Sequence, residues 1–142
     1  MEITTDATCF DINLIHRFLS EESTWAKNIP IETVKKSLQH SLCFAGFENG
    51  QQVAFARVVS DFATFAYLVD VFVVTGARGK GHSKTLLNAV LAYPELQGLR
   101  RFLLASSNAR GVYEKFGFTP LGKPEIFMEI NRPNAYNAEA NI

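Results

Sequence analysis

The chain has 142 residues, of which 47% are hydrophobic and 20% charged, and its 14 basic residues balance its 14 acidic ones. This length and composition predict a single folded domain with its own core rather than a disordered or fibrous chain. Zero net charge argues against a broad nucleic-acid-binding surface, so any site for a polyanion must be local.

Several other classes are disfavoured by what the sequence lacks. The two cysteines, Cys9 and Cys43, are too few for a disulfide framework or a zinc cluster, and the three histidines share no short ligand spacing. The longest apolar-rich run, residues 63–74, is too short to cross a bilayer and contains Asp70. The N-terminus lacks the pattern of a secretory signal. We therefore expect a cytoplasmic protein with no metal, nucleic-acid or membrane partner.

The first third of the chain predicts two helices. In "FDINLIHRFLS", Asp11 is placed to cap a helix that carries an apolar stripe. In "PIETVKKSLQH", Pro30 suits the first helical position. The polar loop between them carries Trp25, the only tryptophan.

A hairpin and a long strand follow. In "SLCFAGFENGQQVAFARVVS", two strand-like runs flank Asn49-Gly50, which is a strong signal for a tight turn. The next run, "ATFAYLVDVFVV", is apolar at nearly every position, which is typical of a strand covered on both faces. Helices must supply that cover.

The last part of the chain alternates helices and strands. A helix is predicted from Gly81 or His82 to Ala92, followed by a strand in "RRFLLAS". A short helix in "NARGVYEKFGF" would be capped by Asn108 and closed at Gly117. We expect a last strand in "EIFMEI" and a loosely held tail over residues 132–142. This order predicts a mixed α/β sheet of six or seven strands.

The glycine-rich segment "GARGKGHS", residues 76–83, admits three interpretations. It can be a plain turn between a strand and a helix. It can be a triphosphate loop, but His82 then occupies the position of the required lysine, and the downstream strand offers no acidic residue for magnesium. It can also be a pyrophosphate site without a metal. Successive backbone N–H groups would then point into one concavity at the start of the helix, with Arg78 and Lys80 as nearby cations.

Two motifs decide among these interpretations. The segment Arg78-Gly79-Lys80-Gly81-His82-Ser83 resembles the pyrophosphate motif Q/R-x-x-G-x-G/A of the GNAT superfamily of acyl-CoA-dependent N-acyltransferases, with Ser83 where Gly or Ala is usual. The segment Tyr113-Glu114-Lys115-Phe116-Gly117-Phe118 resembles a second family element. The resemblance covers residues 53–130 well, and it implies a single GNAT-like domain over residues 1–142. The sheet would be mostly antiparallel, with helices on both faces.

The resemblance also implies a reaction and a cosubstrate. A primary amine would attack acetyl-CoA directly within a ternary complex, with no metal. The loop from Arg78 to Ser83 would hold the pyrophosphate, and the preceding strand would splay so that backbone groups near Phe72, Val73 and Val74 meet the pantetheine arm. A CoA-binding or sensing module without transfer activity is the alternative function. Many relatives are dimers, so a homodimer is a further expectation.

The chemical roles are assigned to few residues. Tyr113 is the candidate general acid, since a phenol with an unperturbed pKa near ~10 stays protonated at neutral pH. Asp70 is either the base that takes the proton of the amine or a carboxylate bonded to backbone or to Arg57. We expect Cys43 to be a buried strand residue rather than a nucleophile. Candidates for lining the acceptor pocket are Trp25, Phe65 and Tyr67. The acceptor is expected to be a small-molecule or peptide amine, whose identity is set by the loops around the pocket.

Overall fold

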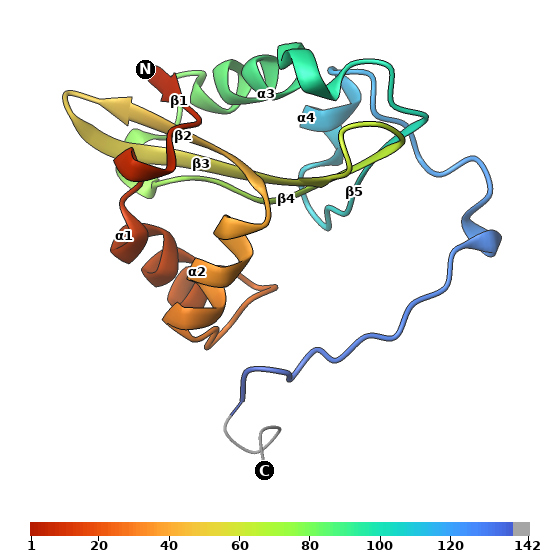
Figure 1. Cartoon of the computed structure of the whole chain (residues 1–142), viewed down its shortest axis with the longest axis horizontal. Helices are drawn as coiled ribbons and strands as arrows, with labels where there is room; N and C mark the ends of the chain where they lie inside the picture. The colour runs from red at the N-terminus through yellow and green to blue at the C-terminus, as the bar shows by residue number, and fades with distance from the viewer. Residues whose placement is uncertain (138–142) are drawn as a thin grey trace.

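The computed structural model describes residues 1–137, which form one sheet with helices on both of its faces (Figure 1). The strands follow one another in space as they do along the chain, from β1 to β5. Neighbouring strands are antiparallel, except that β4 and β5 are parallel. The mixed, mostly antiparallel sheet is therefore confirmed. Its strands are β1 (Glu2–Thr4), β2 (Leu42–Glu48), β3 (Gln51–Ser60), β4 (Phe65–Val73) and β5 (Arg101–Leu104).

The expectation of six or seven strands was wrong, because the described residues form five. The segment "EIFMEI" begins within a short 3₁₀ turn, Pro124–Ile126, and continues as backbone without a neighbouring strand. An alternating apolar pattern favours an extended segment, but a strand forms only where another strand satisfies its backbone groups. The sequence also gave no warning of β1, which pairs with β2 over only three residues.

Helices cover the two faces of the sheet. The cap predicted for α1 is confirmed, since the Asp11 carboxylate accepts a hydrogen bond from the Leu14 N–H. Two other caps differ from expectation. Pro30 precedes α2 instead of beginning it, and Ala109 rather than Asn108 precedes α4, with no side-chain cap. The helices are α1 (Ile12–Arg17), which continues as a π-helical turn (Phe18–Glu22), α2 (Ile31–Gln39), α3 (His82–Ala92) and α4 (Arg110–Glu114).

Two apolar clusters hold these layers together. On one face, the stripe of α3 packs on small residues of the central strands, and Leu86, Leu87 and Val90 are fully buried there. On the other face, α1 and α2 pack on longer side chains, and Phe18 stacks on Phe72 of β4 with ring centroids 4.0 Å apart. Each such side chain contributes about 1.5–3 kcal/mol on burial, so the two clusters fix the position of β4 between the helical layers.

Cys43 lies in the second cluster, on β2. Burial raises the pKa of its thiol to about 12. The Arg57 charge lowers this pKa and the Asp70 charge raises it, both by less than burial does. A thiol that stays protonated is a poor nucleophile. The structure therefore agrees with its interpretation as a buried strand residue.

A β-bulge interrupts the pairing of β3 with β4. Arg57 is opposite Val69 and Phe55 is opposite Phe72, so one residue of β3 faces two residues of β4. Asp70, the first of those two, adopts a left-handed conformation with φ of 57°. A bulge re-aims side chains and bends its strand. Here it turns the Asp70 carboxylate toward Arg57, on the face covered by α1 and α2.

The C-terminal segment leaves the sheet after α4, runs outside the molecule and returns beneath α1 and α2 (Figure 1). Near its end, Tyr136 packs against the cluster formed by those helices, and the Asn28 side-chain amide donates a hydrogen bond to Asn137. The remainder of the predicted loose tail, residues 138–142, lies outside the described part. None of the helices described between residues 1 and 137 is long and apolar enough to cross a membrane.

Candidate active site

The parallel strands β4 and β5 pair along only the first part of β4 and are not paired beyond it. They pair only from Phe65–Leu68 against Arg101–Leu104, while β4 continues to Val73. Beyond Leu68, none of the described residues forms a strand on the β5 side of β4. The Val74 N–H donates to the Val53 carbonyl of β3. Because the backbone N–H and carbonyl groups of successive strand residues point to opposite edges, those of Val73 point toward the opening. The opening implied by the resemblance is present, and its backbone groups lie next to the glycine loop.

The glycine loop, defined here as residues 75–83, connects this edge to the start of α3. Gly79 and Gly81 have φ values of 81° and 79°, a region that side chains with a Cβ rarely adopt. The backbone N–H groups of residues 79–84 find no acceptor within residues 1–137. Such a row of N–H groups at a helix N-terminus is a binding site for an anion. A Cβ placed on either glycine would meet nothing within 4 Å, so the space beside both glycines is open.

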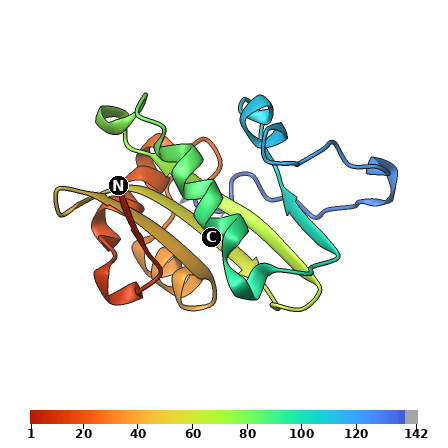
Figure 2. The same cartoon turned by 90° about the horizontal axis from the view of Figure 1, so that it is seen from above.

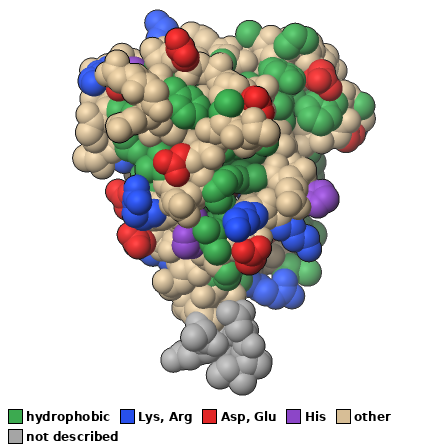
Figure 3. Space-filling model, turned by 60° about the vertical axis from the view of Figure 1, so that its left-hand side comes forward, with side chains coloured by type: hydrophobic (Ala, Val, Ile, Leu, Met, Phe, Trp, Pro, Cys, Tyr) green, Lys and Arg blue, Asp and Glu red, His purple; other side chains and the backbone are tan. Residues whose placement is uncertain are grey.

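The cations of the glycine loop are held by other parts of the protein. The Arg78 Nε donates a hydrogen bond of 2.9 Å to the Val73 carbonyl, which ties this side chain to the end of β4. The Lys80 Nζ lies 3.5 Å from a carboxylate oxygen of Glu48, at the end of β2. On the face shown in Figure 3, acidic and basic side chains are interspersed.

Glu48 is a member of the site that the sequence reasoning missed. Its second oxygen lies 3.0 Å from Nε2 of His82, the first residue of α3, whose side chain is only 8% exposed. Partial desolvation raises the pKa of Glu48, but the contacts with His82 and Lys80 outweigh it, so the pKa is lowered. Glu48 thus attaches the loop to the tip of the β2–β3 hairpin. Ser83, the next residue of α3, is exposed.

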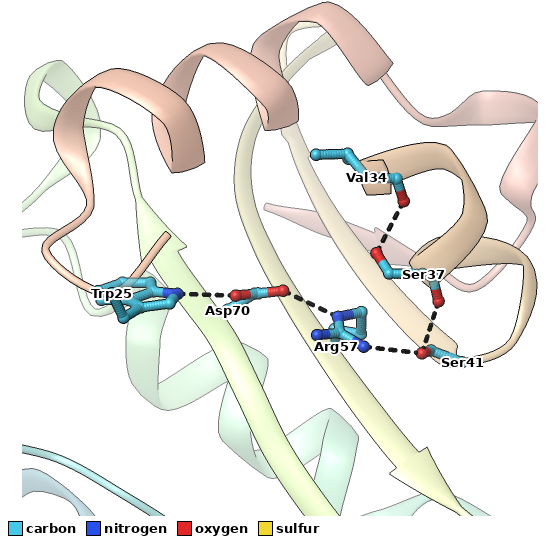
Figure 4. A network of polar contacts seen from close by, with 6 residues as sticks. All are labelled: Trp25, Val34, Ser37, Ser41, Arg57 and Asp70. Carbon is cyan, nitrogen blue, oxygen red and sulfur yellow. Dashed lines mark hydrogen bonds and ion pairs between the residues drawn. The ribbon is translucent and has the colours of Figure 1, made fainter. Parts of the chain in front are cut away.

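The bulge places Asp70 at the centre of a polar network (Figure 4). The carboxylate is 7% exposed and accepts hydrogen bonds from Arg57 Nε at 2.8 Å and from Trp25 Nε1 at 2.7 Å. Arg57 also donates to the Ser41 hydroxyl at 3.1 Å, and that hydroxyl donates to the Ser37 carbonyl. The ion pair with Arg57, one of the two alternatives for Asp70, is thus observed. Whether Asp70 also takes a proton from an amine stays a prediction.

Three predicted pocket residues come to the same face of the sheet. Trp25 is half exposed beside Asp70. Ala66 and Leu68 point into the α3 cluster, so Phe65 and Tyr67, which alternate with them, lie on the α1–α2 face. Both side chains are half-buried. The structure thus places these aromatic side chains on one face of the sheet, with only Trp25 in contact with Asp70, and assigns them no ligand.

Tyr113 lies on α4, on the face of the sheet that α3 covers, whereas this network lies on the opposite face. Its ring packs edge-to-face against Phe118, with centroids 6.1 Å apart, and against the α3 cluster. Burial raises the pKa of its hydroxyl above the ordinary value of a tyrosine. The hydroxyl therefore stays protonated at neutral pH, and it forms no hydrogen bond with the part of the chain that the structure describes. Within residues 1–137, no three or more His, Cys, Asp or Glu side chains are grouped so as to hold a metal ion.

Comparisons with known proteins agree with this geometry. The model of the GNAT acetyltransferase family matches residues 12–118, which is more than half of the chain. A crystal structure from Xanthomonas campestris pv. campestris, described as a candidate acetyltransferase of that family, is 55% identical over 96% of both chains, with a TM-score of 0.95. A candidate acetyltransferase of Gibberella zeae is 25% identical over 80% of this chain and 75% of its own length. The chain belongs to the GNAT family of acetyltransferases, which use acyl-CoA.

A more distant likeness concerns the fold alone. A Mycobacterium tuberculosis protein solved in complex with CoA is 14% identical and superposes with a TM-score of 0.70, over 85% of this chain and 73% of that one.

Proposed function

We propose that the protein transfers an acetyl group from acetyl-CoA to a primary amine, by direct attack within a ternary complex. The observation that carries the proposal is the continuity of two features. The open edge of β4 leads directly into a loop whose successive N–H groups lack acceptors among the described residues. A pantetheine arm and a pyrophosphate are joined in the same order in CoA. Family membership and the CoA complex of the distant M. tuberculosis protein support this choice of donor.

The donor would be held mainly by backbone. The residues Arg78, Gly79, Lys80, Gly81, His82 and Ser83 would surround the pyrophosphate, with the start of α3 supplying a positive end. The β4 segment Phe72, Val73 and Val74 would accept the pantetheine arm as a strand accepts a neighbour, through the groups on its open edge. This arrangement requires few cationic side chains, which suits a loop whose Lys80 is already paired with Glu48.

The transfer itself needs three catalytic functions: stabilisation of the oxyanion, protonation of the leaving thiolate and removal of a proton from the amine. As the amine nitrogen forms its bond to the thioester carbon, the carbonyl oxygen gains negative charge, which the Val73 N–H at the open edge would stabilise. The carbon–sulfur bond then breaks, and the Tyr113 hydroxyl would protonate the departing thiolate. The proton lost by the amine would go through water to Asp70. Trp25, Phe65 and Tyr67 would form the wall of the acceptor pocket on that face.

One observation favours the alternative of a CoA-binding module without transfer activity. Both oxygens of Asp70 already accept strong donors, Arg57 and Trp25, which leaves the carboxylate less free to act as a base. The two functions differ in what happens after CoA binds. A module would bind acetyl-CoA and leave its thioester intact with every amine offered.

Tyr113→Phe separates these functions. We would measure thiol release from acetyl-CoA with a panel of primary amines, and CoA affinity by titration calorimetry, for the wild type and the variant. General acid catalysis by one side chain contributes about 10²–10⁴-fold to a rate. The proposal predicts a loss of kcat in that range with CoA affinity unchanged. Equal turnover in both proteins would remove Tyr113 from the mechanism, and an inert wild type that binds CoA would establish the binding module.

A further inference from the structure

The carboxylate of Glu48 contacts two residues of the glycine loop at once. One of its oxygens lies 3.5 Å from Lys80 Nζ, and the other lies 3.0 Å from His82 Nε2. Between these two residues stands Gly81, whose φ of 79° turns the backbone toward the start of α3. Glu48 therefore holds the turn from both sides, at the place where the row of N–H groups leads into the helix.

The buried imidazole of His82 depends on this contact. Its side chain is 8% exposed, and its Nε2 makes no well-directed hydrogen bond within residues 1–137, so the nearby carboxylate of Glu48 is what compensates its burial. A buried polar atom that loses its partner is unfavourable. Without Glu48 the imidazole would have to turn toward water. Because His82 is the first residue of α3, the N–H groups at the helix start would move with it.

The two elements joined by this contact are each fixed by other interactions. Glu48 pairs with Gln51 across the tight turn of the β2–β3 hairpin. On the other side of the loop, Arg78 is bonded to the end of β4 and Ala77 is buried in the α3 cluster. Figure 2 shows the hairpin and the start of α3 on the same side of the molecule, away from the segment that follows α4. The contact thus links residues 79–82 to a rigid hairpin.

Charge alone would make Glu48 unfavourable beside an anion site. Its negative charge repels a pyrophosphate and partly neutralises Lys80. Its side chain is 27% exposed, however, so water and salt screen this repulsion. Donors that are already in place bind an anion without the ordering cost of a mobile loop. The benefit of holding the loop is therefore expected to exceed the repulsion.

We propose that Glu48 is a positioning residue of the donor site, which acts through His82 to hold the glycine loop in its anion-binding shape before acetyl-CoA arrives. The inference rests on the proposed function of this loop. It gives the β2–β3 hairpin, to which no step of the transfer is assigned, a role in the affinity for the donor. Glu48 contacts the loop and none of the groups assigned to the chemical step, so its effect falls on donor binding.

The experiment compares two substitutions that separate charge from reach, by titration calorimetry with CoA. Glu48→Asp keeps the charge, but its side chain is one methylene shorter and draws the carboxylate away from His82. Glu48→Gln removes the charge and keeps a side-chain oxygen within reach of His82. We expect Glu48→Asp to bind CoA about 10-fold more weakly, as for the loss of one charge-assisted hydrogen bond. Glu48→Gln should stay within about threefold of the wild type.

Two further variants complete the design. Glu95→Gln is the matched control, because it removes the same charge at an exposed position beyond the other end of α3, and it should leave CoA affinity unchanged. His82→Phe keeps a ring but removes the Nε2 atom. In that background, Glu48→Asp should lose most of its effect on CoA affinity. Melting temperatures without ligand would establish that each variant is folded.

The possible outcomes are distinct. Equal CoA affinity in the wild type and Glu48→Asp would overturn the proposal, and so would a full effect of Glu48→Asp in the His82→Phe background. Tighter binding by Glu48→Gln with an unchanged Glu48→Asp would show that Glu48 acts only through its charge, which also contradicts the proposal. A folded wild type that does not bind CoA would instead overturn the proposed function, and this inference with it.

Discussion

Removing the guanidinium of Arg57 tests whether the bulge depends on its ion pair. Asp70 is 7% exposed and its carboxylate has two side-chain donors, Arg57 and Trp25. Arg57→Met keeps much of the aliphatic volume and leaves a buried charge with one neutral donor. Breaking a buried pair in this way costs about 3–5 kcal/mol. We expect the lower end, about 3 kcal/mol, because the Arg57 side chain is 18% exposed and water can replace part of it.

This free energy corresponds to a measurable shift in melting temperature. Unfolding entropies of about 2.1 cal/mol/K per residue give roughly 300 cal/mol/K for a chain of this length, so 3 kcal/mol lowers the melting temperature by about 10 °C. Calorimetry and urea unfolding would both report the change. The double variant Arg57→Met with Asp70→Asn should recover more than half of it. The new amide is neutral and can still accept from Trp25.

Two results would refute this reasoning. A loss below about 1 kcal/mol for Arg57→Met would mean that the carboxylate is adequately hydrated without its partner. Strict additivity of the two substitutions in the double-mutant cycle would mean that Arg57 and Asp70 do not interact in solution. In either case the network around the bulge would be a feature of packing rather than of charge.

Three further predictions follow from other sites. Gly81→Ala should lower CoA affinity or stability by about 1–2 kcal/mol, because the φ of Gly81 is 79°. Gly76→Ala, at a position without a positive φ, is the control and should be neutral in the same CoA titration. Asp61 accepts three backbone N–H groups and the Thr64 hydroxyl in the β3–β4 turn, which holds its pKa well below the usual range. A lowered pKa stabilises the fold above the unfolded-state value of about 3.9 and loses that effect below it, so the melting difference between wild type and Asp61→Asn should shrink as the pH falls through about 4. A constant difference would contradict this assignment. Finally, a thiol reagent should modify exposed Cys9 quickly in the folded protein and leave buried Cys43 untouched; two fast thiols would contradict the packing of β2.

Local signals in the sequence predicted local structure well. Asn49 and Gly50 both adopt positive φ, as a two-residue hairpin turn requires, and the hairpin forms where expected. Asp11 caps α1 through its own side chain. The start of α3 after Gly81 was also predicted within one residue. Each of these features depends on contacts between residues close together in the chain, so neighbouring residue types are sufficient to identify them.

Features that depend on distant partners were harder to predict. Glu48 reaches the glycine loop across 32 residues of sequence, and nothing in its own surroundings marks it as part of a site. The segment 125–130 has apolar residues typical of a strand, but a strand also needs a neighbour, and the chain offers none to this segment among its described residues. The position of Asp70 follows from a bulge, whose extra residue is set by how two strands pair. The sequence indicated Arg57 as one possible partner for Asp70, but it could not choose between that ion pair and catalysis.

The most direct test of the central claim is a thermal-shift titration with acetyl-CoA, CoA and ATP-magnesium in parallel. A ligand that binds only the folded state raises the melting temperature with concentration, by about 2.7 kcal/mol of added stability at 100 times its dissociation constant. We predict a concentration-dependent rise with both CoA compounds, none with ATP-magnesium, and a weaker response in Gly81→Ala. No shift with either CoA compound at millimolar concentration would contradict the assignment of the glycine loop and the open edge of β4 as the donor site.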